Sequence, residues 1–312
     1  MLFRSGDIMR ELGHNVQAAK IHRELTVRDI RSPEIRTRIL RSLITDYFAA
    51  RQYQAAFPYI DKLLEINRND HWALTKRLEL YEAIGDWRNA FEAERKLQSV
   101  TKVRDNEKLA LLKVQEGHKI VVEGGKEHDA RLQYRAAIKL DPKNAPAYLA
   151  LADSYIQDNR PQDALKEWSN FFDANPRLAH LAFDRMEETV FELGRFQEVE
   201  RIYRKLVREN PDNARAVVAL ARFLYRKGET EEAIQVCEEG LEHSPNSIWI
   251  RRNLFRFLAE EGKHERAVNL GLEILDLVMK EREAFTCAEC DDASEDPHWR
   301  CPECQRGRSY NI

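Results

Sequence analysis

Four of the five cysteines lie within 18 residues near the C-terminal end of this 312-residue chain. They form two Cys-x-x-Cys pairs, Cys287 with Cys290 and Cys301 with Cys304, separated by ten residues. Each pair can present two thiolates from one tight turn, and two such knuckles can close a tetrahedron around one metal ion with sulfur at about 2.3 Å. Because four thiolates leave no coordination position open, we expect a structural metal site, with zinc favoured and iron as the alternative.

Three other uses of the cysteines compete with this hypothesis. The Cys-Pro-Glu-Cys stretch suits an iron centre of the rubredoxin type, but rubredoxin knuckles usually continue with glycine, and here Asp291 and Gln305 follow the pairs. A nucleic-acid-binding ribbon would need basic and aromatic residues, whereas the loop between the pairs carries four acidic side chains that would repel phosphate. A pair of redox disulfides is the least favoured use. We interpret His298, in the same loop, as a residue that packs against the site or contacts one of its ligands, and not as a ligand itself.

The composition of the whole chain is typical of a soluble, mostly helical protein. Only 12 Gly and 10 Pro interrupt it, and 43% of its residues are apolar, which is enough for a large core. Fifty Lys and Arg against 53 Asp and Glu give a formal charge of −3, so any attraction to nucleic acid or anionic lipid must be local. No apolar run reaches the roughly 18 to 20 residues of a membrane span, and the first residues do not resemble a signal peptide. We therefore expect the chain as written to be cytoplasmic.

A repeated helical pattern precedes the cysteines. Its clearest copy is NAPAYLALADSYIQDNRPQDALKEWSNFFDANP, residues 144–176, in which apolar positions three and four residues apart predict two amphipathic helices broken at 158–161. Small residues at Ala152 and Ala164 would let the two helices approach closely. The template recurs with a period of about 34 residues, the length of the tetratricopeptide repeat. We predict an all-α tetratricopeptide superhelix of about eight helical hairpins over residues 1–283, followed over 284–312 by a small rubredoxin-like or zinc-ribbon module.

Three local features refine this prediction. Two intervals, around residues 31–36 and 100–109, are longer than the repeat allows, so we expect a bend or an extended helix at each. Gly124 falls in a hairpin turn and is interpreted as a turn residue. Cys237 occupies the repeat position that Tyr203 holds in another copy, so we expect it to be a buried core thiol.

Arrays of this kind present an extended binding surface lined by the first helix of each hairpin. Nothing in the repeats resembles a catalytic site, so we predict a binding protein and not an enzyme. Repeat phase places five arginines on that surface in the last two units: Arg215, Arg222, Arg226, Arg252 and Arg256. Units three to six present mainly acids there: Glu79, Glu82, Glu123, Asp153, Asp184, Glu188 and Glu192. We expect a bipolar groove whose arginines hold carboxylates, with ordinary solvated charges as the competing interpretation.

The order of these features resembles the lipopolysaccharide assembly protein B family of bacterial regulators. The similarity covers essentially the whole chain, including LITDYFAARQYQAA and LYEAIGDWRNAFEAERKL, and its most specific mark is that FTCAEC and HWRCPEC directly follow the repeats. The resemblance implies a rubredoxin-type metal domain in which all four clustered cysteines are ligands. It also implies an adaptor on the cytoplasmic face of the inner membrane, which presents the LpxC-type deacetylase of lipid A synthesis to an FtsH-type membrane protease.

The sequence departs from that family at its start. Family members begin with an apolar membrane anchor, whereas this sequence opens inside the first helix of a repeat, so membrane contact is expected only through an anchor absent from this chain. We expect protein partners and no nucleic acid, and homo-oligomerisation is left open. The competing functional hypothesis is a generic assembly scaffold with an electron-transfer or metal-sensing tail.

The cysteine module is too short to bury a core of its own. Its metal must therefore supply the folding free energy, about 10 to 16 kcal/mol in comparable zinc modules. Phe285 and Trp299, each two residues ahead of a cysteine, are expected to pack the knuckles against the last helices.

Overall fold

The computed structural model describes residues 2–28, 30–283, 285–287, 289–290, 293–294 and 303–304. The chain forms two compact units, Met1–Ala174 and Asn175–Ile312. Within the described residues, every regular element is an α-helix except one 3-10 helix and one pair of two-residue strands. The α-helices pair into eight successive hairpins, which confirms the predicted all-α array. Among those residues, no helix combines the length and the apolarity that crossing a bilayer requires.

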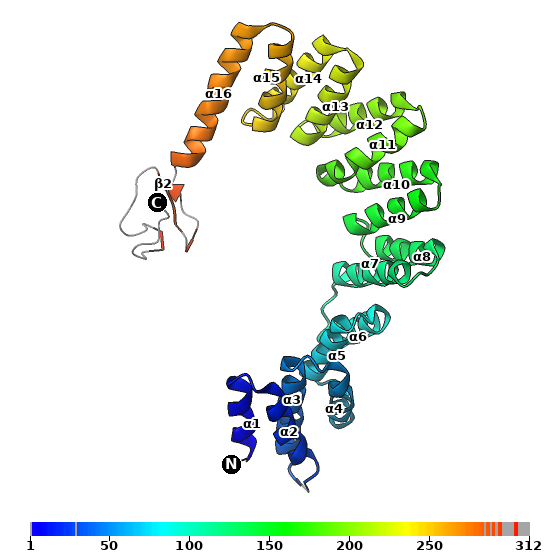
Figure 1. Ribbon diagram of the computed structural model, residues 1–312, viewed down its shortest axis with the longest axis vertical. Helices are drawn as coiled ribbons and strands as arrows, with labels where there is room; N and C mark the ends of the chain where they lie inside the picture. Colours follow the sequence, from blue (N-terminus) through cyan, green and yellow to red (C-terminus); the bar gives the residue numbers. More distant parts are fainter. Residues whose placement is uncertain are drawn as a thin grey trace. The chain divides into compact units, whose positions relative to one another are not determined.

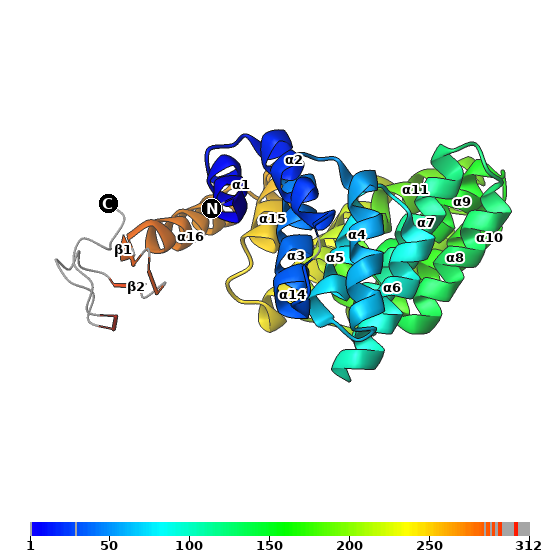
Figure 2. The same ribbon diagram turned by 90° about the horizontal axis from the view of Figure 1, so that it is seen from below.

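The first unit contains five helical hairpins that follow one another along the chain (Figure 1). Its helices are α1 (Leu2–Glu11), α2 (Asn15–Thr26), α3 (Pro33–Ala49), α4 (Tyr53–Ile66), α5 (His71–Ala83), α6 (Trp87–Thr101), α7 (Asn106–Val122), α8 (Glu127–Leu140), α9 (Ala145–Gln157) and α10 (Pro161–Ala174). Each helix packs mainly on its neighbours in sequence, and α2, α3 and α4 lie side by side in both views (Figure 2). The core therefore runs through the stack and is not gathered at one centre.

Small residues allow the close approach of the paired helices. The alanines at the same repeat position are completely buried in the second helices of six hairpins: Ala18, Ala56, Ala90, Ala130, Ala164 and Ala233. Large side chains such as Trp168 and Phe171 fill the space further along and are equally buried. The predicted break after α9 is a tight turn in which Asn159 adopts a positive φ of 55°. Gly124, with φ of 77°, likewise occupies the predicted turn between α7 and α8.

Both long intervals extend a helix. α3 and α7 are each 17 residues long, compared with 13 in α5 and α9. α3 begins at Pro33 after Ser32, whose side chain accepts a hydrogen bond from Ile35 N. α7 begins after Asp105, which caps Lys108 N. The added residues in each interval thus carry their own helix-start signals.

The second unit differs from the predicted pattern at its start. Its helices are η1 (Pro176–Ala182), α11 (Phe183–Glu192), α12 (Phe196–Glu209), α13 (Ala214–Lys227), α14 (Thr230–His243), α15 (Ile248–Glu260) and α16 (His264–Glu283). The sequence predicted one α-helix where the 3-10 helix η1 precedes a short α11 of 10 residues. Asn213 explains part of the difference, because its side-chain amide donates to the Pro176 carbonyl at 2.7 Å and fixes the chain there.

A small strand pair follows the last helix. β1 (Phe285–Thr286) pairs antiparallel with β2 (Ala293–Ser294), with Phe285 opposite Ser294. Cys287 directly follows β1, so the first cysteine pair lies within the connection between the two strands. The strand pair thereby sets the direction in which the first knuckle begins.

Candidate metal centre and partner-binding surface

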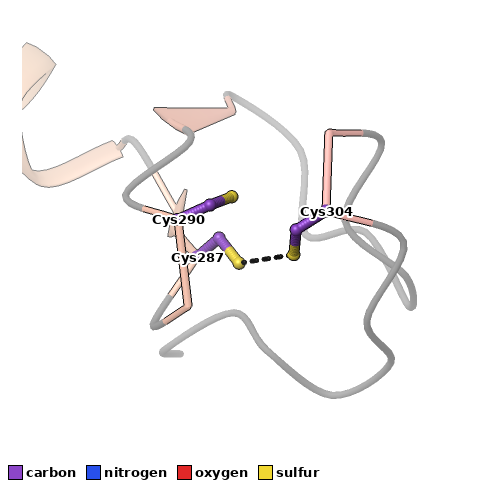
Figure 3. A group of neighbouring side chains, drawn as sticks. All are labelled: Cys287, Cys290 and Cys304. Atoms are coloured by element: carbon purple, nitrogen blue, oxygen red, sulfur yellow. Dashed lines mark hydrogen bonds between the residues drawn. The ribbon is translucent and has the colours of Figure 1, made fainter.

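Three of the four predicted cysteine ligands lie together (Figure 3). The Sγ atoms of Cys287, Cys290 and Cys304 are all within 4.8 Å of one another, and those of Cys287 and Cys304 are 3.7 Å apart. In a tetrahedral site with metal–sulfur bonds of about 2.3 Å, two sulfurs are about 3.8 Å apart. A disulfide would hold them at about 2.05 Å. The spacing of Cys287 and Cys304 therefore fits two ligands of one metal ion and not a covalent bridge.

The three clustered cysteines come from both Cys-x-x-Cys pairs. Cys287 is completely buried where β1 ends, Cys290 is exposed in the following turn, and Cys304 is half-buried in a second turn. Thiolate sulfur is a ligand that zinc and iron both accept, so the donor set fits either metal. The fourth predicted ligand, Cys301, lies outside the described residues, and its role stays a prediction. His298, Trp299 and the acidic loop also lie outside them, except for the strand β2.

Cys237 does not belong to this site. Its thiol is completely buried in α14, as the repeat pattern predicted, and Tyr203 is equally buried at the same position of the preceding unit. Burial, helped by the nearby carboxylate of Glu238, raises the pKa of the Cys237 thiol to about 12. A thiol that stays protonated is a packing group and not a metal ligand.

The five predicted arginines lie on two first helices that pack against each other. Arg215, Arg222 and Arg226 project from α13, and Arg252 and Arg256 from α15; all five side chains are exposed. The structure thus brings them onto neighbouring elements, as the repeat phase indicated. Their assignment to partner binding stays a prediction.

Two of these arginines already have carboxylate partners. Arg226 pairs with Glu187 of α11 at 2.5 Å and lies over the Phe191 ring, 5.9 Å from its centroid. Arg256 pairs with Glu260 at 3.5 Å and lies over Tyr225. In the described part of the chain, Arg215, Arg222 and Arg252 form no ion pair. These three are therefore the cations most available to a partner.

The sequence did not reveal the structural role of Glu187. Its carboxylate accepts hydrogen bonds from the Tyr203 hydroxyl at 2.7 Å and from Arg226, so it joins α11, α12 and α13. Burial raises the Tyr203 pKa, and Glu187 raises it further, so the hydroxyl stays a donor. The available signal was a tyrosine at a core position, because a buried hydroxyl needs a partner.

The acidic half of the predicted groove is partly balanced within the first unit. Glu79 pairs with Lys76 at 2.5 Å, Glu82 lies 3.9 Å from Lys108, and Glu123 lies 3.7 Å from Lys119. Such exposed pairs contribute little stability, but they reduce the charge that a basic partner would meet.

Comparisons with known proteins address the repeats and the whole chain. Family models described as tetratricopeptide repeat match residues 133–166 and 190–247. Lipopolysaccharide assembly protein B from Haemophilus influenzae is 21% identical over 97% of this chain and 76% of its own length. The protein of the same name from Escherichia coli K12 is 19% identical over 96% of this chain and 77% of its own. The crystal structure of MamA, 21% identical, covers 53% of this chain and 96% of that chain with a TM-score of 0.36.

The repeat matches fall on helices that the structure shows as stacked hairpins, and the longest similarities are too extensive to end before the cysteine module. The chain is accordingly a tetratricopeptide-repeat protein that is similar, over nearly its whole length, to lipopolysaccharide assembly protein B.

Proposed function

We propose that this protein is a non-enzymatic scaffold that regulates lipopolysaccharide synthesis by presenting the LpxC-type deacetylase of the lipid A pathway to an FtsH-type membrane protease. The observation that carries the proposal is similarity over 97% of the chain to a protein named for lipopolysaccharide assembly. In this proposal the protein acts at the cytoplasmic face of the inner membrane.

The arginines of α13 and α15 would hold acidic groups of a partner. Arg215 and Arg222 are seven residues apart, which is about 10 Å along a helix, so they can meet two carboxylates of one extended segment. Their guanidinium groups can each hold a carboxylate through two parallel hydrogen bonds. A partner carboxylate at Arg226 would instead compete with Glu187, which already occupies that guanidinium. Recognition should therefore depend most on Arg215, Arg222 and Arg252.

The cysteine module would hold one structural metal ion. Cys287, Cys290, Cys301 and Cys304 are the proposed ligands, and zinc is the favoured metal. Bound metal would supply the free energy that folds this short segment, so that the end of the chain becomes a fixed surface next to the last hairpin.

Recovery of bound proteins from a membrane fraction tests the proposal. A tagged form of the protein, isolated from detergent-solubilised membranes of its own host, should carry both the protease and the deacetylase, identified by mass spectrometry. Arg222→Glu combined with Arg252→Glu should deplete the deacetylase at least tenfold. The matched control is Arg201→Glu with Arg208→Glu, two exposed arginines on the second helix α12, and it should retain both proteins. Recovery of neither protein with the unaltered chain would remove the adaptor assignment.

A further inference from the structure

A basic pocket with an apolar floor lies at one edge of the first unit. Its volume is about 320 Å³, and it lies between the end of α2, the beginning of α3 and the end of α4. Leu25, Ile39 and Leu40 form its floor, and Arg28, Arg36 and Lys62 stand at its rim. We call this region, together with Val27, Ile35 and Ile66, the α2–α4 edge.

The rim cations are not neutralised by the protein. In the described ranges, Arg28, Arg36 and Lys62 form no ion pair with a carboxylate. Arg36 donates instead to the Ile30 carbonyl at 3.2 Å, and the Lys62 ammonium lies 5.4 Å from the Tyr59 ring centroid. This differs from the exposed Arg95 and Arg160, which both pair with a carboxylate three residues away in the sequence.

The surrounding sequence gives the α2–α4 edge a local positive charge. Residues 20–41 contain seven Lys and Arg against three Asp and Glu, although the whole chain carries −3. Glu65 is the one acidic side chain among the described residues that line the pocket. The α2–α4 edge therefore attracts anions at short range even though the protein as a whole does not.

Exposed apolar side chains alternate with these cations. Val27 is 84% exposed and stands next to Arg28, Ile35 is 54% exposed and precedes Arg36, and Ile66 is 46% exposed at the pocket itself. Ile35 lies one turn before the buried Ile39 on the same side of α3. Scattered exposed apolar residues are common, but three of them among unpaired cations around one pocket form a surface that is both hydrophobic and basic. Such a surface matches the interface of an anionic bilayer, where cations meet lipid phosphates and apolar tips enter the acyl boundary.

We propose that the α2–α4 edge docks on an anionic phospholipid surface. Lipid phosphates would bind at Arg28, Arg36 and Lys62, while Val27, Ile35 and Ile66 would enter the boundary between headgroups and acyl chains. An acidic protein segment would use the cations but would leave the exposed apolar side chains in water, so the lipid is the better match. The proposal does not rest on the deacetylase, the protease or a membrane anchor.

The expected size of the effect follows from the charge. Each Lys or Arg close to an anionic leaflet strengthens partitioning about fivefold, so removing two should weaken it about 25-fold. Because the Debye length falls from about 10 Å at 0.1 M salt to about 3 Å at 1 M, the same binding should also fall steeply with added salt.

Vesicle co-sedimentation of the full 312-residue chain tests the proposal. The protein should bind vesicles that contain phosphatidylglycerol and not vesicles of phosphatidylcholine alone. Arg28→Gln with Arg36→Gln should lower the partition coefficient about 25-fold, and Val27→Ser with Ile35→Ser should lower it several-fold with all charges retained. The matched control, Arg88→Gln with Lys96→Gln on the exposed face of α6, should bind as the unaltered chain does. Circular dichroism establishes that each variant is folded.

Several results would overturn the proposal. One is equal binding to both vesicle types, and another is an equal loss in the control variant. Tight binding of inorganic phosphate in calorimetry without vesicle binding would mark the pocket as a site for a free anion. Binding of polyglutamate that depends on Arg28 and Arg36, again without vesicle binding, would assign the α2–α4 edge to a protein partner.

Discussion

A cluster of charged and polar side chains joins the first three helices, and we predict that the substitution Asp46→Asn destabilises these helices strongly and locally. Asp46 lies in α3 and is completely buried; it accepts from Arg10 of α1 at 2.7 Å, and a hydrogen bond of 2.5 Å joins it to His22 Nδ1 of α2. The other ring nitrogen of His22 lies 3.2 Å from the Phe3 carbonyl. Gly6 is needed here, because a Cβ at that position would lie 2.5 Å from the His22 ring. One carboxylate thus holds two basic side chains from two other helices.

Asp46→Asn keeps the size of the side chain but removes the charge that compensates the Arg10 guanidinium. Breaking a buried ion pair by changing one partner costs about 3 to 5 kcal/mol, because the remaining charge is left buried and uncompensated. Arg10 keeps its contact with Asp7 at 2.7 Å and is partly exposed, so the lower end of that range is expected. The matched control is Asp61→Asn, whose ion pair with Arg77 is exposed and should contribute no more than about 1 kcal/mol.

Hydrogen exchange followed by mass spectrometry measures the effect helix by helix. Because repeats interact mainly with their neighbours, the loss should be concentrated in α1 and α2 and should fade along the first unit. A loss of 3 kcal/mol speeds exchange through local opening by about 150-fold. Amides of α1 should therefore lose most of their protection in Asp46→Asn, whereas those of α9 should be unchanged. If α1 exchanged in Asp46→Asn as it does in Asp61→Asn, the buried cluster would not be what docks the first helix.

The remaining predictions concern the metal site and one carboxylate. Elemental analysis should find one metal ion per chain, and the protein should be colourless if the metal is zinc and show a visible absorption band if it is iron. Cys287→Ser should weaken the retention of the metal against a chelator at least tenfold. Cys237→Ser should leave the metal content unchanged and lower the free energy of unfolding. In the second unit, a hydrogen bond from Lys227 lowers the pKa of Glu200, so its contribution to stability is present above the unfolded pKa of about 4.3 and is lost as the pH falls through the lower folded value. Glu200→Gln should accordingly flatten the acid side of a urea-denaturation series at several pH values, and an unchanged acid limb would contradict this assignment.

Local regularities account for what the sequence could predict. Each hairpin is specified by side chains close to one another in sequence, such as Ala152 and Ala164 with the turn between them, so the period alone located the eight hairpins. The cysteine pairs are equally local, and three of their sulfurs do meet. Contacts between residues far apart in sequence, which form only when the hairpins stack, could not be predicted from such local patterns. Arg226 reaches Glu187 across 39 positions, and the Pro176 carbonyl of η1 accepts from the amide of Asn213, the residue just before the later helix α13. The α2–α4 edge was missed because net charge averages over the whole chain.

The two proposed binding surfaces belong to different units and can be separated by mutation. The α2–α4 edge uses residues of the first unit, whereas the arginine row lies on α13 and α15 of the second. Substitutions at independent sites without shared partners have nearly additive effects. Arg28→Gln with Arg36→Gln should thus reduce lipid binding while detergent-solubilised protein still recovers its partners, and Arg222→Glu with Arg252→Glu should show the converse. If each pair of substitutions impaired both activities to the same degree, lipid and protein partners would have to share one surface, and the assignment of separate roles to the two units would be wrong.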